Sequence, residues 1–173
     1  MAEERSGVCT FLGNPLTLIG PELSVGDDAP DFSVIELTEG LDERTLMSSS
    51  GVRLFNVVPC LDTPVCDEQT RRFNSELGNL PEGVKVITVS ADLPFAQARW
   101  CGEADAGGIQ FLSDHKETSF GEAYGVLIKE LRLLARSIFV VDSNNNIAYR
   151  EYVGEVTEHP NYDAALEAAK NAS

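Results

Sequence analysis

Residues 54–73, LFNVVPCLDTPVCDEQTRRF, constrain this chain more than any other stretch. An apolar run rich in Val and Phe leads through Pro59 and a turn-like segment into a helix-like pattern after Pro64. This order predicts a strand, a loop and the start of a helix. With Thr63 as the N-cap and Pro64 at the first helical position, Cys66 falls in the first turn. Unpaired backbone N–H groups and the helix dipole there favour thiolate over thiol, so the spacing predicts a nucleophile.

Strand-like and helix-like segments alternate around this stretch. Two continuous apolar runs, 52–58 and 84–89, flank the predicted helix and make a βαβ unit with a parallel pair of strands. Runs 137–141 and 147–152 flank a polar turn and predict an antiparallel hairpin. A mixed sheet with helices on both faces follows, which is the layout of the thioredoxin-like α/β fold. The other predicted elements are an N-terminal β-hairpin (8–12 and 16–19, with its turn at 13–15), strands at 31–37 and 109–112, a helical turn at 45–50, a helix capped by Asp92 that ends at Cys101 before Gly102, a helix at 118–124 that Gly125 ends, and a closing helix at 162–172.

Length and composition indicate a single globular domain, and the net charge argues against nucleic acid and membrane partners. The 173 residues fit one domain, 1–173, and 43% hydrophobic content argues against disorder. The formal net charge of −15 would repel nucleic acid phosphates and anionic lipid, so we expect no nucleic acid or membrane partner. The charged N-terminus lacks the apolar region of a signal peptide, and no run approaches the roughly 18 apolar residues of a membrane helix. We therefore expect a cytoplasmic protein, in which four cysteines serve catalysis more readily than a disulfide scaffold.

Two motifs resemble those of a known family. Pro59, Thr63 and Cys66 stand in the spacing P-x-x-x-T-x-x-C, which resembles the active-site loop of peroxiredoxins. Residues 91–102, ADLPFAQARWCG, resemble the segment that carries the second cysteine in the bacterial thiol peroxidase branch, a group of atypical two-cysteine peroxiredoxins. The resemblance runs over most of the chain, from the turn at 13–15 to residues 161–166. It implies the thioredoxin-like fold, reduction of hydroperoxides in antioxidant defence, thioredoxin as the reductant and a homodimer.

The remaining cysteines have different expected roles. Cys101 ends the predicted short helix before Gly102, where fraying would let a thiol move towards a partner. Its surroundings alone favour an inert cysteine, but the resemblance implies that it resolves oxidised Cys66 through an intramolecular disulfide. Cys60 lies six residues before Cys66, which is not the C-x-x-C spacing of a thioredoxin-style pair, and we expect no role for it. Cys9 lies in the N-terminal hairpin and is expected to be inert.

Reduction of a peroxide by a thiolate requires fewer catalytic groups than acyl transfer does. Acyl transfer usually requires a base and an orienting acid, which this sequence does not display. The sulfur attacks one oxygen while the other leaves as alkoxide, so the site must stabilise charge on the leaving oxygen. Thr63 could hydrogen-bond the thiolate or the peroxide, and backbone N–H groups near Val65 and Cys66 are candidate donors. Arg136, just before the strand at 137–141, matches the catalytic arginine of the family by position, although an arginine at a strand end is more often solvated.

The expected cycle requires no metal, flavin or haem. Only His115 and His159 are present and neither stands close to a cysteine in sequence, so a tetrahedral zinc site has little support. Cys66 becomes a sulfenic acid that condenses with a thiol, and a dithiol such as thioredoxin reopens the disulfide. The sequence does not rank hydrogen peroxide against organic hydroperoxides, although the family leans towards alkyl ones and apolar residues such as Phe55, Val65 and Phe95 are compatible with that.

Two other functions stay open at this point. A non-catalytic redox switch could use Cys66 and Cys101 to change a binding surface, although it would not need Thr63 and Arg136. A thioredoxin-like interaction module with inert thiols is the third possibility, and it predicts that no cysteine alkylates unusually fast at neutral pH.

Overall fold

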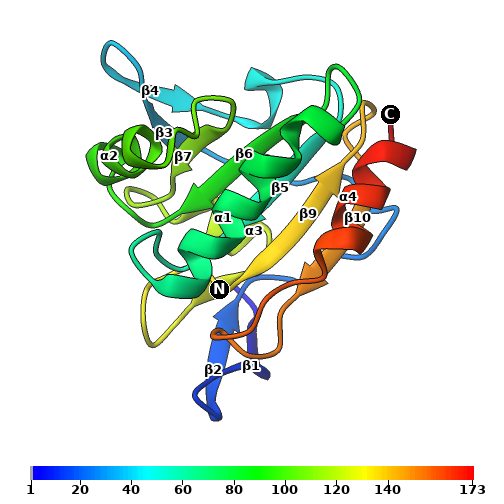
Figure 1. Ribbon diagram of the computed structural model, residues 1–173. Coiled ribbons are helices and arrows are strands. Elements are labelled where there is room, and N and C mark those ends of the chain that lie inside the picture. The colour runs from blue at the N-terminus through cyan, green and yellow to red at the C-terminus, as the bar shows by residue number, and fades with distance from the viewer. Residues whose placement is uncertain (1) are drawn as a thin grey trace.

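A seven-stranded mixed sheet forms the centre of the protein, with the order β10-β9-β5-β6-β7-β3-β4 (Figure 1). The computed structural model describes residues 2–173. As predicted, β5 and β6 are parallel and β9 and β10 form an antiparallel hairpin. The strands of this sheet are β3 (Val34–Leu37), β4 (Leu41–Arg44), β5 (Arg53–Val57), β6 (Lys85–Ser90), β7 (Gln110–Ser113), β9 (Ser137–Val141) and β10 (Ile147–Tyr152), and the helices are α1 (Pro64–Glu76), α2 (Pro94–Ala104), α3 (Ser119–Ala123) and α4 (Tyr162–Asn171).

Helices cover both faces of this sheet, which confirms the predicted layout. Successive side chains of a strand point to opposite faces, so β5 contributes to two apolar clusters. Leu54 packs in the cluster that includes Phe73 of α1 and Leu166 of α4. Phe55 packs in the cluster that includes Phe120 of α3. Figure 1 shows α1 and α4 together against one face. Each helix within residues 2–173 is too short or too polar to cross a membrane.

The predicted N-terminal hairpin is present, as part of a second sheet with the order β1-β2-β8. Its turn is Leu12–Gly13, where both residues have positive φ (50° and 81°), as a two-residue turn of a twisted hairpin requires. The turn predicted at 13–15 was therefore wrong, because Pro15 already pairs with Thr10 in the ladder. The strands of this sheet are β1 (Glu4–Phe11), β2 (Asn14–Ile19) and β8 (Leu127–Ile128).

Three further predictions need correction. The helix α2 begins at Pro94 with Leu93 as its N-cap, so Asp92 is not the cap. This helix does not end at Cys101 but continues to Ala104, and it stops where Asp105 adopts the left-handed conformation. The strand predicted at 31–37 is paired only over Val34–Leu37. Two short strands, β4 and β8, were not predicted, while the helical turn expected at 45–50 is a 3-10 turn at Leu46–Ser48.

Candidate active site

Cys66 lies in the first turn of α1, directly after the loop that follows β5. Thr63 has the extended backbone of an N-cap (φ −93°, ψ 148°) and Pro64 takes the first helical position, as the sequence predicted. The Thr63 hydroxyl does not cap the helix but donates to the carbonyl oxygen of Cys60 at 2.9 Å. Cys66 itself is fully buried. The backbone therefore presents its sulfur at the N-terminal end of a helix, away from bulk water.

Arg136 is buried against Cys66 and is not a solvated strand-end residue, since only 2% of it is exposed. Its Nη2 donates to the Cys66 Sγ at 3.3 Å. Its Nε and Nη2 both donate to the carbonyl oxygen of Val156, at 2.9 and 2.7 Å, and its Nη1 donates to Gln69 Oε1 at 2.9 Å. Among these partners only Cys66 can ionise. The buried guanidinium therefore stabilises negative charge on this sulfur, because it is always protonated and weakly solvated there.

A row of buried polar side chains holds Arg136 in this position. The amide Nε2 of Gln69 donates to Asn56 Oδ1 at 2.6 Å, which turns the amide oxygen of Gln69 towards Arg136. Asn56 in turn donates to the hydroxyls of Thr70 and Thr88, at 3.1 and 3.0 Å. All four of these supporting side chains are fully buried. This row was not predicted from the sequence, although the polar Asn56 in the middle of an apolar strand was a signal for it.

The pocket in front of Arg136 is mostly apolar and has a volume of about 510 Å³. Three of the predicted residues line it: Pro59, Thr63 and Arg136. Of the apolar residues suggested for the substrate, Val65 lines this pocket, while Phe55 lies in the core and Phe95 is 60% exposed on α2. The other lining residues are Phe11, Cys60, Pro64, Leu131, Leu133, Val156 and Thr157.

Cys101 lies in the last turn of α2 and lines a different groove, beside Pro94, Gln97 and Phe111. It is a free, partly buried thiol, and burial raises its pKa. It also packs against the apolar cluster that includes Cys66. The structure thus places three of the five predicted site residues on the lining of one pocket, Cys66 in contact with Arg136, and Cys101 on another helix, α2.

Cys60 and Cys9 are also free thiols, and both are held in the protonated form. Burial and a hydrogen bond to the Asp92 carboxylate raise the pKa of Cys60 to about 11. Burial and the charges of Glu130 and Glu155 raise the pKa of Cys9 to about 11. Over residues 2–173, no cluster of three or more His, Cys, Asp or Glu side chains is arranged to hold a metal ion.

Comparison with known proteins decides the family. The Redoxin family model matches residues 24–166. A protein named thiol peroxidase from Bacillus subtilis (strain 168) is 57% identical over 162 residues, which cover 93% of this chain and 95% of the relative. A thiol peroxidase from Staphylococcus aureus (strain MRSA252) is 52% identical over 163 residues, with 94% and 97% of the two chains covered. The chain belongs to the Redoxin family, in its thiol peroxidase branch.

Solved structures agree with this membership. A peroxiredoxin-like protein from Aquifex aeolicus superposes with a TM-score of 0.85 at 39% sequence identity, and the match covers 99% of each chain. The predicted thioredoxin-like peroxiredoxin fold is therefore confirmed, as is the predicted enzyme class, a thiol-dependent peroxidase.

Alkylation at controlled pH tests the difference between the thiols. Because the pKa of Cys60 is raised to about 11, this thiol stays protonated at pH 7 and should react slowly. Its rate should rise about tenfold per pH unit up to about pH 11, since the thiolate is the reactive form. Iodoacetamide labelling followed by peptide mass spectrometry measures this, with Asp92→Asn as the comparison that should speed the labelling of Cys60 at neutral pH. Labelling of wild-type Cys60 at pH 7 as fast as that of an unstructured cysteine peptide would contradict the account.

Replacement of Gln69 tests the buried polar row. Gln69→Leu leaves Arg136 Nη1 and Asn56 Oδ1 without their partner, so the free energy of unfolding should fall by about 2 kcal/mol. The guanidinium would also lose its orientation, and the second-order rate of peroxide with Cys66 should fall at least about tenfold. Stopped-flow oxidation and urea unfolding measure the two effects.

Gln97→Leu is the matched control for this substitution. Gln97 is also a buried helix glutamine, and its Nε2 donates to Ser90 Oγ and the Leu112 carbonyl, at 3.0 and 2.9 Å. It has no hydrogen bond to Arg136, so its loss should reduce stability and leave the oxidation rate of Cys66 unchanged. An equal loss of rate in both variants would show that Gln69 acts through stability alone.

Proposed function

We propose that this enzyme reduces hydroperoxides with Cys66 as the attacking thiolate and Cys101 as the thiol that resolves the oxidised form. The observation that carries the proposal is the contact between the Arg136 guanidinium and the Cys66 sulfur at 3.3 Å, in a buried site next to an apolar pocket. A redox switch would not need a permanently charged donor at the thiolate.

In the first step the Cys66 sulfur attacks the nearer peroxide oxygen and the O–O bond breaks. Cys66 becomes a sulfenic acid, and the other oxygen leaves as an alkoxide that takes up a proton. Arg136 lines the pocket and can stabilise the developing charge. The Thr63 hydroxyl already donates to the Cys60 carbonyl, so its oxygen can accept a hydrogen bond from the O–H of the hydroperoxide. Pro59 presents a ring without an N–H, which keeps that wall of the pocket apolar.

In the second step the Cys101 thiol condenses with the sulfenic acid to form a Cys66–Cys101 disulfide and water. A dithiol reductant of the thioredoxin type then reopens this disulfide by exchange. Four free thiols fit a reducing compartment such as the cytoplasm. The mostly apolar lining of the pocket favours organic hydroperoxides over hydrogen peroxide, because an alkyl group gains from leaving water there.

Single-cysteine variants separate the two steps. Cys66→Ser should consume no peroxide, while Cys101→Ser should react with one equivalent of cumene hydroperoxide at the wild-type rate and then fail to turn over with thioredoxin. Cys60→Ser should keep full turnover. A thioredoxin-coupled assay, together with trapping of the sulfenic acid, measures these outcomes. Wild-type protein that forms the disulfide but shows no turnover with excess reductant would favour the redox switch instead.

We also propose that two copies associate. Phe11 and Leu131 line the rim of the pocket and are 40% and 41% exposed, and Leu12 beside them is 69% exposed, so a partner surface would bury apolar area there. Sedimentation velocity should give the mass of a dimer at micromolar concentration, and Phe11→Glu should shift it towards the monomer. A monomer at high concentration would contradict this.

A further inference from the structure

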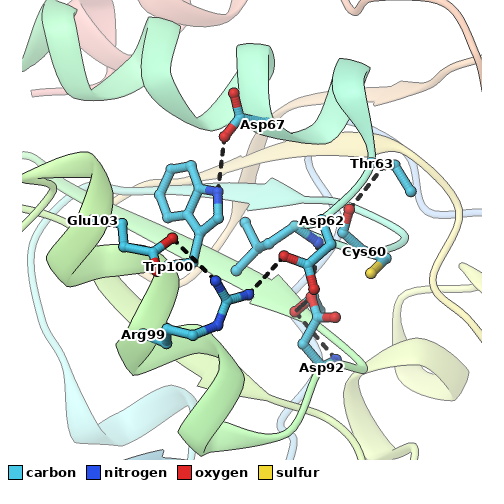
Figure 2. A network of polar contacts seen from close by, with 10 residues as sticks. Cys60, Asp62, Thr63, Asp67, Asp92, Arg99, Trp100 and Glu103 are labelled. Carbon is cyan, nitrogen blue, oxygen red and sulfur yellow. Dashed lines mark hydrogen bonds and ion pairs between the residues drawn. The ribbon is translucent and has the colours of Figure 1, made fainter.

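The residues next to the two proposed redox cysteines are joined by a hydrogen bond (Figure 2). Asp67 follows Cys66, Trp100 precedes Cys101, and the indole Nε1 of Trp100 donates to Asp67 Oδ1 at 2.9 Å. Trp100 is only 4% exposed and packs in the same apolar cluster as Cys66. One buried aromatic side chain therefore ties the first turn of α1 to the last turns of α2.

Arg71 reinforces this contact from the next turn of α1. Its Nε lies 2.9 Å from the second oxygen of Asp67, and its guanidinium stacks over the Trp100 ring at 5.4 Å from the centroid. Both carboxylate oxygens of Asp67 are thus engaged. We call Asp67, Arg71 and Trp100 the latch.

A second link between the two segments is weaker. Arg99 of α2 pairs with Asp62 of the loop at 2.8 Å, and both side chains are more than half exposed (Figure 2). Exposed ion pairs contribute little to stability because water and salt screen them. The latch contains a buried indole and a charge-assisted hydrogen bond, so it is the stronger of the two links.

The two cysteines lie in different surroundings, which a disulfide between them would have to bring together. A disulfide brings two sulfurs to about 2 Å and two Cα atoms to within about 7 Å. In the structure Cys66 contacts Arg136, whereas Cys101 lines a separate groove and sits inside the last turn of α2. Because Trp100 directly precedes Cys101 in α2, a movement of the Cys101 segment towards Cys66 would disturb the contacts of Trp100 with Asp67 and Arg71.

We propose that the latch restrains Cys101 in the reduced enzyme and so sets how long the Cys66 sulfenic acid persists. Asp67 and Trp100 are positioning residues in this account, because they act through the helices that carry the cysteines. The inference rests on the Cys66–Cys101 pairing proposed above.

The sulfenic acid has two fates, and the latch acts on one of them. Condensation with the Cys101 thiol forms the S–S bond and releases water. Alternatively a second hydroperoxide transfers an oxygen atom to the sulfenic acid, which yields sulfinic acid and the corresponding alcohol. A firm latch slows the first reaction and leaves the second unchanged, so it makes the enzyme more sensitive to overoxidation at high peroxide.

Trp100→Phe tests the latch, because it keeps an aromatic ring and removes the N–H donor. Formation of the sulfenic acid should proceed at the wild-type rate, while formation of the disulfide should be about tenfold faster, as expected for loss of a hydrogen bond to a charged acceptor. The peroxide concentration that converts half of Cys66 to sulfinic acid should rise by a similar factor. Rapid quenching with alkylation and mass spectrometry measures all three species.

Two further variants keep the test decisive. Asp67→Asn retains an acceptor but loses the charge, so it should give an intermediate acceleration, and it keeps Trp100, the single tryptophan of the chain, as a fluorescence reporter of the opening. Glu103→Gln is the matched control, since it removes an ion pair with Arg99 that lies within α2 and does not reach α1. It should leave both rates unchanged.

The possible outcomes separate the latch from the proposed function. A disulfide that forms at the wild-type rate, or more slowly, in both Trp100→Phe and Asp67→Asn would overturn the latch and leave the peroxidase mechanism standing. Wild-type protein that forms no Cys66–Cys101 disulfide would instead overturn the proposed pairing.

Discussion

The contact between Arg136 and Cys66 is the interaction on which the site depends. Arg136 is only 2% exposed, so its guanidinium needs hydrogen-bond acceptors within the protein. Two segments far apart in the sequence supply them: α1, through Cys66 and Gln69, and the carbonyl of Val156. Arg136 directly precedes β9, so its position is fixed in turn by the pairing of β9 with β5. The placement of a buried cation at the sulfur therefore depends on the pairing of the central strands.

Selectivity among the four thiols follows from their surroundings. Cys66 has a buried cation and a helix N-terminus, whereas burial raises the pKa of Cys9, Cys60 and Cys101 and keeps them protonated at neutral pH. This difference in surroundings suits a cycle in which one thiol attacks the peroxide and another stays protonated until the first is oxidised. The proposed resolving thiol sits on another helix, and in the latch proposal the hydrogen bond between Trp100 and Asp67 restrains the segment that carries it.

The sequence predicted the parts of the site that depend on local spacing, and missed those that depend on packing. The position of Cys66 after Thr63 and Pro64 follows from helix capping rules, and the structure agrees. The burial of Gln69 and Thr70 could not be predicted from the polar sequence of α1, because it depends on how α1 lies on the sheet. The end of α2 was misplaced because Gly102 looked like a breaker, whereas the backbone N–H of Asp105 satisfies the carbonyls of Cys101 and Gly102.

The most direct test is single-turnover oxidation of the reduced protein with one equivalent of cumene hydroperoxide, followed by peptide mapping of the disulfide. A Cys66–Cys101 link that forms within seconds, and is absent when Cys66 is replaced by serine, is the result that the account predicts. Slow oxidation, or a link between Cys60 and Cys66 in place of it, would contradict the assignment of these two cysteines.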